Sequence, residues 1–457
     1  MSSKPDGLYS RRAAMALVAA GAAAVPEAAG AAVHALAPVG ATPYGFVVAA
    51  VDAPADLKAA TPYVCTGAND QNVINAAIAA LPAATGAGRG GCIFLSAGTF
   101  GITAPIKLRG YMAIEGAMIG VTYIGNRPTA SGDMMVFDAA ANEQQIFLRI
   151  ARMHLAGNRK WVRRGSCIRI TGAGIYDLVI EDVWVYGAAE DGVYLEQTWG
   201  ANFCNLISEY NGRDGLHVER NAFDSAVEGP KIVQSKMVKN GRHGIFLGRY
   251  VNDALIATSE MAGGAYYAGY GLYVDRSTGH QVTACRFVSH ETGCSGGVAL
   301  DAASQCTVTG NVFRSLATAR CPVAVDILSS SSRNVVASNT FNLATGDTPI
   351  IDATGRNVLA SNSGWASRSA GLVVRAHDAG DRRRITIAHR LGQPKPVGSV
   401  VVCTVQPADA ASSELRWYVD AADATSVVVR TTSDMADGVE YRLQVIIEYS
   451  NREAAPA

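Results

Sequence analysis

The chain has 457 residues, and its 39 lysines and arginines balance its 39 aspartates and glutamates. A net charge of zero excludes a whole-protein attraction to nucleic acid, so we expect no nucleic-acid partner. A charged fraction of only 17% and 47 glycines exclude long charged helices and favour many turns and short strands.

Nine cysteines stand singly along the chain, without a C-x-x-C pair. This spacing excludes the common linear zinc and redox motifs. Because nine is odd, at least one thiol must be free or paired between chains. The sequence also lacks a G-x-x-x-x-G-K-[ST] phosphate loop, an H-E-x-x-H zinc helix and a G-x-S-x-G elbow.

Residues 1–37 have the pattern of a removable export signal. Ser10, Arg11 and Arg12 precede a short apolar run, and small residues continue to Ala37. The paired arginines resemble a twin-arginine signal, which carries folded proteins across a bacterial membrane; a general secretory signal is the alternative. Both predict a periplasmic or secreted bacterial protein without membrane insertion after signal removal, since no other stretch could span a bilayer. Residues 38–64 are then a linker or N-terminal segment.

The next segment, Asn69 to Leu108, reads NDQNVINAAIAAL…GGCIFLSAGTFGITAPIKL and predicts a helix followed by short strands. The helix has an apolar stripe formed by Ile74, Ala77, Ile78 and Leu81. The segment resembles the start of the pectate lyase superfamily, in which such a helix caps a right-handed parallel β-helix. The resemblance covers roughly residues 65 to 365 and implies this all-β fold for residues 65–368.

The same resemblance implies less about activity, because the superfamily includes lyases, hydrolases, epimerases and phage tailspikes. It admits Ca²⁺ as a cofactor, since pectate lyases assemble a calcium site across coils. No compact cluster of aspartates marks such a site in the sequence, so no metal ligand is assigned and no other cofactor is expected.

Short strands then recur along the chain, with apolar and variable residues alternating as in a β-strand. The first series comprises DGVYLEQ from Asp191, DGLHVER from Asp214, HGIFLGR from His243, YGLYVDR from Tyr270, GGVALDA from Gly296, PVAVDIL from Pro322 and PIIDATG from Pro349. Their corresponding positions are 23, 29, 27, 26, 25 and 26 residues apart. A unit of two or three short strands per 23–29 residues leaves no room for helices and predicts a β-solenoid.

A second strand series follows the first and carries one column of small or polar residues. We expect these side chains to stack coil on coil and to form hydrogen bonds with their counterparts above and below. The column is Ser208, Ser235, Ser259, Cys285, Asn311, Asn339 and Asn362.

From about Gly371 the strands become longer and more widely spaced. This change predicts a separate small antiparallel β domain over residues 369–457. The stretch IAHRLGQPKP, residues 387–396, is similar to a C-terminal module that follows β-helices in tail-associated proteins. Such modules often help three chains assemble, so the resemblance implies a homotrimer.

The strand period places three columns of the first series on the outside of the solenoid. The first holds Tyr194, His217, Phe246, Tyr273, Ala299 and Ala324. The second holds Glu196, Glu219, Gly248, Asp275, Asp301 and Asp326. The third holds Gln197, Arg220, Arg249, Arg276 and Ala302. Aromatic, acidic and basic stripes side by side suit a groove for a charged sugar chain.

The leading hypothesis is therefore an exported enzyme that cleaves an acidic polysaccharide by β-elimination. Arg220, Arg249 or Arg276 would neutralise the uronate carboxylate, His217 or His243 would be the base, and Tyr273 would be the acid. Tyr194, Phe246, Tyr270 and Tyr273 would contact the sugar, together with Arg220 and Arg276.

Three other functions stay open. A glycoside hydrolase would use Glu219 and Asp275, two coils apart with Gly248 between them, and a uronan epimerase would use the same groove. Glu196 and Glu219, on adjacent coils, lie nearer the retaining distance. A trimeric glycan-binding or tailspike-like protein without turnover is the third class.

Plainer structural roles compete with each of these assignments. Asp301, Asp326 and Asp352 can simply cap the turns that follow their strands. The arginines can pair with neighbouring acids, and His217 and His243 can be inert surface side chains. The repeated frame NGRDG and NGRHG, at residues 211–215 and 240–244, is a structural repeat first.

Overall fold

The computed structural model describes residues 45–82, 90–138, 145–172, 175–220, 227–264, 269–290, 293–316, 319–328, 330–344, 347–354, 356–360, 362, 367–375, 383–388, 399–407, 410–422, 426–436 and 439–451. The predicted export signal and the first part of the predicted linker lie outside these ranges, as does most of the stretch 387–396. Among the described residues, no helix has the length and apolar character that crossing a membrane would require.

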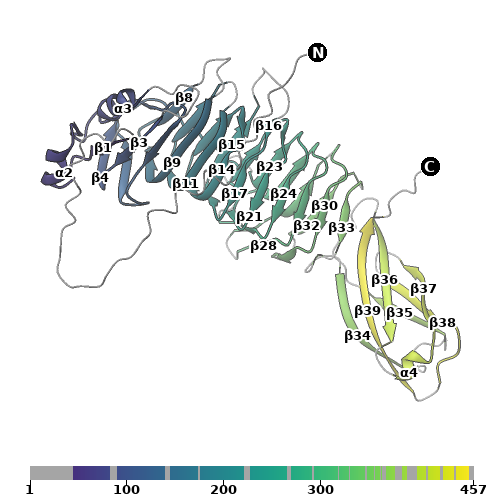
Figure 1. The fold of residues 1–457 in the computed structure, drawn as a ribbon. Coiled ribbons are helices and arrows are strands. Elements are labelled where there is room, and N and C mark those ends of the chain that lie inside the picture. The colour runs from purple at the N-terminus through teal and green to yellow at the C-terminus, as the bar shows by residue number, and fades with distance from the viewer. Residues whose placement is uncertain are drawn as a thin grey trace, which may run out of the picture. The chain divides into compact units, whose positions relative to one another are not determined.

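The predicted N-terminal helix is confirmed as α3 (Gln71–Ala80), which follows the short helix α2 (Ala55–Ala60). Of the predicted stripe, Ile74, Ala77, Ile78 and Leu81 are all buried, and α3 packs beside β1 at one end of the solenoid (Figure 1). Asp70, just before the helix, accepts hydrogen bonds from the backbone N–H groups of Thr66, Gly67 and Gly101. One carboxylate therefore ties the start of the helix to strand β4 (Gly98–Ile102).

Two parallel sheets form the solenoid in the described part of the chain, and their strands lie side by side along it (Figure 1). The ten-stranded sheet comprises β5 (Ile106–Lys107), β8 (Met135–Asp138), β10 (Ile168–Thr171), β12 (Val193–Glu196), β15 (Leu216–Glu219), β19 (Ile245–Leu247), β23 (Tyr270–Asp275), β26 (Gly296–Asp301), β29 (Val323–Ile327) and β32 (Thr348–Asp352).

The 21-stranded sheet forms the other walls. It comprises β1 (Gly45–Ala49), β2 (Tyr63–Val64), β3 (Gly91–Leu95), β4 (Gly98–Ile102), β6 (Met112–Glu115), β7 (Thr122–Asn126), β9 (Gln145–Ala156), β11 (Ile175–Tyr186), β13 (Thr198–Trp199), β14 (Asn202–Glu209), β17 (Lys231–Val233), β18 (Lys236–Val238), β21 (Leu255–Ala257), β22 (Glu260–Met261), β24 (Gln281–Thr283), β25 (Arg286–Val288), β27 (Thr307–Thr309), β28 (Val312–Arg314), β30 (Val335–Ala337), β31 (Thr340–Asn342) and β33 (Val358–Ala360). A small pair, β16 (Val227–Glu228) and β20 (Val251–Asn252), is parallel as well.

One residue per coil bends the chain between two walls of the 21-stranded sheet. These residues share a left-handed backbone with φ of 50–52° and are Asp182, Asn205, Gln234, Thr258 and Ala284. Asn205 Nδ2 donates to Asp182 Oδ1 at 2.8 Å, which links two successive bends. Asp182 and Asn205 suit this backbone, because short polar side chains tolerate it best.

The interior is filled by apolar side chains stacked from coil to coil. Phe287, Phe313 and Phe341 stack with ring centroids 4.7 and 5.1 Å apart, and Leu216 and Val218 are buried. Every coil covers the apolar face of its neighbour, which is how a solenoid obtains a continuous core.

The polar column inside the solenoid is confirmed, with one correction. Asn311 Nδ2 donates to Asn339 Oδ1 at 3.1 Å, and Asn339 Nδ2 donates to Asn362 Oδ1 at 3.0 Å. Further back, the backbone N–H of Ser235 donates to Ser259 Oγ. Ser208, however, is in register with Met237 rather than Ser235, so it does not belong to the column.

The outer columns are also corrected at their C-terminal end. The first column runs Tyr194, His217, Phe246, Tyr273, Ala299 and then Asp326, in place of the expected Ala324. The sequence prediction aligned the acids of successive strands with one another. Val325 and Ile327, however, are fully buried in the core, so the residue between them must face outward. Asp326 therefore leaves the acidic column.

The C-terminal strands pair antiparallel, as expected. One sheet has the order β34 (Ser367–Arg375), β39 (Glu440–Asn451), β36 (Ser399–Pro407), and the other β35 (Arg384–Ala388), β38 (Ser426–Thr431), β37 (Trp417–Ala422). The short helix α4 (Ala410–Ser413) lies between β36 and β37 in the sequence. Strand β34 was not predicted, and it crosses the expected boundary at residue 369. All nine cysteines of the chain are free thiols.

Candidate functional site

A partly buried polar cluster lies on the outer face of the ten-stranded sheet, around β12 and β15. We call it the His217 cluster; it consists of Asp191, Tyr194, Glu196, Arg213, Asp214, His217, Glu219 and Arg242. The residues come from three successive coils. On two of these coils, the cluster residues Arg213, Asp214 and Arg242 belong to the repeated NGRxG frame.

The repeated frame is a backbone link between coils. Asp191 Oδ1 accepts the backbone N–H of Asp214 at 3.0 Å, and Asp214 Oδ1 accepts that of His243 at 2.9 Å. His243 continues the series, because its Nδ1 accepts the backbone N–H of Tyr270 at 3.0 Å. A Cβ added to Gly215, the last residue of the first frame, would lie 2.6 Å from Gly244 O, so the close approach of the coils needs glycine there.

His243 cannot serve as the base that the sequence suggested while this link is made. Burial lowers its pKa to about 4, against the opposing attraction of Asp214. The ring is therefore neutral near pH 7, with Nδ1 occupied as an acceptor and the proton on Nε2. In this state His243 offers only a donor.

His217 is held by the spare oxygen of Asp214. Its Nδ1 lies 2.8 Å from Asp214 Oδ2, and its Nε2 lies 3.3 Å from Glu219 Oε2 without hydrogen-bond alignment. Burial alone would lower the pKa of His217, but its contacts with the two carboxylates outweigh burial and raise it. The ring is stacked between Tyr194 and Phe246, at centroid distances of 5.1 and 4.5 Å, and only 5% of the residue is exposed.

Arginines compensate the two buried aspartates. Arg213 donates to Asp191 through Nε at 3.2 Å and Nη2 at 2.8 Å, and Arg242 binds both oxygens of Asp214. Burial would raise the pKa of Asp214, yet the bonds from Arg242 and His217 hold it well below its usual value. The pKa of Asp191 is raised, first by burial and then by the neighbouring charge of Asp214.

Glu196 and Glu219 meet at one hydroxyl group. They are paired in register on β12 and β15; Tyr194 Oη donates to Glu219 Oε1 and lies 3.5 Å from Glu196 Oε2. The contact with His217 lowers the pKa of Glu219 to about 2, against burial, and the bond from Tyr194 lowers it further. Burial, and then the charge of Glu219, raises the pKa of Glu196. Two adjacent carboxyl groups thus have opposite pKa shifts.

The cluster does not fit a calcium ion. Ligand atoms of Asp191, Asp214 and His217 lie within 4.8 Å of one another, which is close enough for a shared metal. However, Arg213 and Arg242 already supply the positive charge, and Ca²⁺ prefers oxygen ligands over an imidazole.

Two of the three arginines of the third outer column lie near Tyr250. The guanidinium carbons of Arg220 and Arg249 lie 4.6 and 5.4 Å from its ring centroid. Arg276 instead binds both oxygens of Asp275, at 2.7 and 3.0 Å. Within the described residues, Arg249 forms no ion pair and is exposed, so it presents its charge to the solvent.

The downstream tyrosines are engaged by acids. Tyr273 Oη donates to Asp301 Oδ2 and Tyr270 Oη donates to Asp326 Oδ2, both at 2.7 Å. Burial and these acids raise the pKa of both hydroxyl groups. Phe246 lies between His217 and Tyr273 with nearly parallel rings, so a sugar would meet mainly the ring edges of this column.

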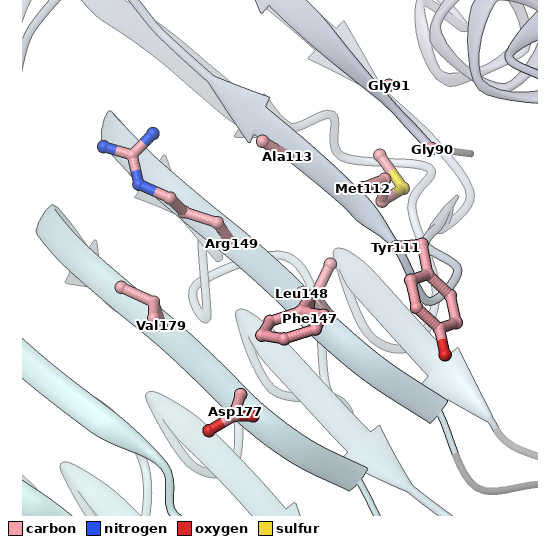
Figure 2. Close-up of a pocket in the computed structure, with 10 residues that line it drawn as sticks. All are labelled: Gly90, Gly91, Tyr111, Met112, Ala113, Phe147, Leu148, Arg149, Asp177 and Val179. Atoms are coloured by element: carbon pink, nitrogen blue, oxygen red, sulfur yellow. The ribbon is translucent and has the colours of Figure 1, made fainter. Parts of the chain in front are cut away.

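A cavity of about 440 Å³ lies elsewhere, on the 21-stranded sheet. Phe147 and Tyr111 line it with residues of β3, β6, β9 and β11 (Figure 2). None of the predicted site residues lines it, and Arg149, its one basic residue, pairs with Glu115 and Glu181. Because the shifted titratable groups are elsewhere, we assign the candidate site to the His217 cluster.

Comparison with known proteins agrees with this architecture. Residues 166–341 match the family model of the right handed beta helix region. The solenoid is thus a right-handed parallel β-helix, as the resemblance implied. No curated protein matches the chain by sequence.

Solved structures include similar folds at low sequence identity. ORF18 of Geobacillus virus E2 has a TM-score of 0.59 and 16% identity, covering 85% of this chain and 76% of its own. The A-module of mannuronan C-5 epimerase AlgE4 from Azotobacter vinelandii has a TM-score of 0.48, 17% identity and coverages of 65% and 91%. DFA-IIIase from Arthrobacter chlorophenolicus A6 has a TM-score of 0.48, 12% identity and coverages of 66% and 84%. The first of these supports the fold alone.

Of the eight residues of the His217 cluster, sequence reasoning chose only Tyr194, His217 and Glu219. Glu196 was named with Glu219 as a pair near the retaining distance but was not chosen as a site residue, while Asp191, Arg213, Asp214 and Arg242 were treated only as parts of the repeat. The sequence did contain a usable signal, the stretch DGLHVE. In it an acid stands three residues before a histidine and a glutamate stands two residues after it, and this spacing puts three polar side chains on one outer surface.

Proposed function

We propose that this chain is an enzyme that hydrolyses glycosidic bonds of an acidic polysaccharide, using Glu196 and Glu219. The supporting observation is the hydroxyl group of Tyr194, which contacts both carboxyl groups. Tyr194 Oη lies 3.5 Å from Glu196 Oε2 and forms a shorter hydrogen bond with Glu219 Oε1, so the two oxygens are at most about 6 Å apart. Retaining glycosidases separate their carboxyl groups by about 5–5.5 Å and inverting enzymes by about 6.5–9.5 Å, so this separation favours a retaining enzyme.

The opposite pKa shifts of Glu219 and Glu196 support different catalytic roles for the two residues. Glu219, ionised above pH about 2, would attack the sugar at its anomeric carbon, and the bond from Tyr194 would orient its oxygen. Glu196, whose pKa is raised, would donate a proton to the leaving glycosidic oxygen and then take one from the incoming water. His217 is a positioning residue that keeps Glu219 ionised.

Cations beside the pair favour an acidic substrate. The guanidinium carbon of Arg169 lies 4.3 Å from the ring centroid of Tyr194, one coil before Glu196. Arg249, exposed, follows Gly248, the position next to Glu219 on the following coil. Arginine forks suit the carboxylates of uronate sugars.

The test is cleavage of polygalacturonate, alginate and hyaluronan, with neutral dextran as the control. We expect new reducing ends without the ultraviolet absorbance of an unsaturated product. Glu196→Gln should lower kcat by about 100- to 10,000-fold, and Glu219→Gln by a comparable factor. Glu228→Gln, an exposed acid on β16, is the matched control and should keep full activity. Undiminished cleavage by both site variants would contradict the proposal.

A second candidate, β-elimination, is favoured by the contact between Asp214 and His217. The carboxylate orients the imidazole as it would orient a general base. Because the pKa of His217 is raised, such a lyase would gain activity as the pH rises, whereas the hydrolase would lose it as Glu196 ionises. An ultraviolet-absorbing product would favour the lyase, and binding without chain shortening would favour a non-catalytic glycan binder.

A further inference from the structure

A loop with an unusual local charge precedes β10. Residues 158–164, which we call the basic loop, read Asn-Arg-Lys-Trp-Val-Arg-Arg in a chain whose total charge is zero. Lys160, Arg163 and Arg164 are exposed, and Trp161 is 63% exposed. Within the described residues none of the four cations forms an ion pair. An exposed tryptophan among uncompensated cations suits an anionic ligand with apolar faces.

The basic loop is fixed to the coils that lead into the His217 cluster. Val162 is buried and its backbone N–H donates to Asn158 O at 3.1 Å, which closes a tight turn. Arg159 donates through its backbone N–H to Gly187 O at 2.9 Å and through Nη1 to Asn211 O at 3.3 Å. Asn211 opens the NGRDG frame that carries Asp214, so the loop lies beside the cluster.

Aromatic rings and another cation continue from the loop across the following coils. Tyr186, 38% exposed, and Tyr210 have ring centroids 5.3 Å apart. Lys239 Nζ donates to Tyr210 Oη at 2.8 Å and lies 5.0 Å from its ring centroid. Such rings can pack against sugar C–H faces.

We propose that the basic loop, Tyr186, Tyr210 and Lys239 form a binding strip for an anionic polysaccharide, which guides the polymer to the His217 cluster. This inference rests on the proposed function for the class of polymer. The strip crosses three coil steps, about 14 Å in all, so it contacts several sugar units at once. We favour a polysaccharide over nucleic acid because Tyr186 and Tyr210 of the strip lie on the same coils as Glu196 and Glu219, whose proposed chemistry acts on glycosidic bonds.

The test is affinity electrophoresis of the full chain in gels that contain polygalacturonate or alginate, with dextran and single-stranded DNA as comparison gels. Lys160→Ala/Arg163→Ala/Arg164→Ala should weaken uronan binding at least tenfold and reduce its salt dependence. Trp161→Ala should weaken it severalfold without changing the salt dependence. The matched control, Arg314→Ala/Arg333→Ala/Arg356→Ala, removes three exposed cations from later coils and should bind as the wild type does.

The outcomes separate the strip from the proposed function. Measurements on the Glu219→Gln background, where turnover is expected to fail, report binding alone. Wild-type uronan binding by the basic-loop variant, equal weakening by the control variant, or stronger retardation by DNA than by uronans would overturn the strip. Loss of binding in the basic-loop variant, with no cleavage by any form of the protein, would support the strip and overturn the hydrolase.

Discussion

Two neighbouring coils carry the same frame, residues 211–215 and 240–244, yet only the first supports a charged site. Asp214 has two acceptor oxygens: Oδ1 makes the link to the next coil and Oδ2 binds His217. His243 has a single acceptor, Nδ1, which the link to Tyr270 uses completely. Both copies of the frame therefore keep the backbone link between coils. A charged site forms only where the linking side chain has a second acceptor atom that can bind another residue.

The largest expected effect is the difference in stability between variants of Asp214 and His243, the two residues that link the coils. Asp214→Ala leaves Arg242 and His217 buried without their carboxylate, which should lower the free energy of unfolding by about 3–5 kcal/mol. His243→Ala loses one acceptor and should cost about 1–3 kcal/mol. Denaturant unfolding measures both.

Asp214→Asn is the control for this pair, because its amide oxygen can keep the backbone link while the charge is lost. We expect a stability between those of the wild type and Asp214→Ala, together with a pKa of Glu219 closer to its ordinary value. Equal costs for Asp214→Ala and His243→Ala would show that the two coils do not differ as described.

The fold was largely predictable because it follows from local rules. The strand period and the apolar stripe of α3 depend on residues close in sequence, and the polar column follows from the recurrence of the same short unit. Register failed where it was judged from residue identity alone: Asp326 was aligned with Asp301, although burial of Val325 and Ile327 sets its position.

The candidate site was less predictable because its contacts depend on which oxygen or nitrogen is free. The sequence placed His217 and His243 on the outside as equivalent bases, and it could not show that Tyr270 occupies the Nδ1 of His243. It likewise could not show that Tyr194 lies between Glu196 and Glu219. The spacing of residues in the sequence predicts which side chains are neighbours, but their hydrogen-bond partners determine which of them can act as a base or an acid.

The two histidines should respond oppositely to pH. Burial lowers the pKa of His243 in the folded state to about 4, from 6.5 when unfolded, so its stabilising contribution is present above pH 6.5 and is lost as the pH falls toward 4. A shift of this size corresponds to about 3 kcal/mol. The pKa of His217 is raised, so its contribution is present below pH 6.5 and is lost as the pH rises through its folded value.

Thermal unfolding between pH 4 and 8 checks this difference. His243→Asn, which can keep the acceptor, should reduce the loss of Tm toward pH 4, and His217→Asn should reduce any loss toward pH 8. His280→Asn is a comparison on another coil, since burial also lowers the pKa of His280 to about 4. Identical pH profiles for all three variants would contradict the assigned pKa directions.

The smallest expected effect concerns Gly248, which occupies on the second coil the position that Glu219 occupies on the first. Gly248 lies beside Glu219, and a Cβ there would be 3.1 Å from both Glu219 Cβ and Phe246 Cε1. Gly248→Ala should therefore shift Glu219 by a few tenths of an ångström, with a change in unfolding free energy below about 1 kcal/mol. Since a misplacement of 1 Å can cost about 100-fold in rate, we expect a decrease in kcat of about tenfold or less. A drop of several degrees in Tm with unchanged kcat would instead mean that Gly248 serves coil packing, and that Glu219 does not depend on the space beside it.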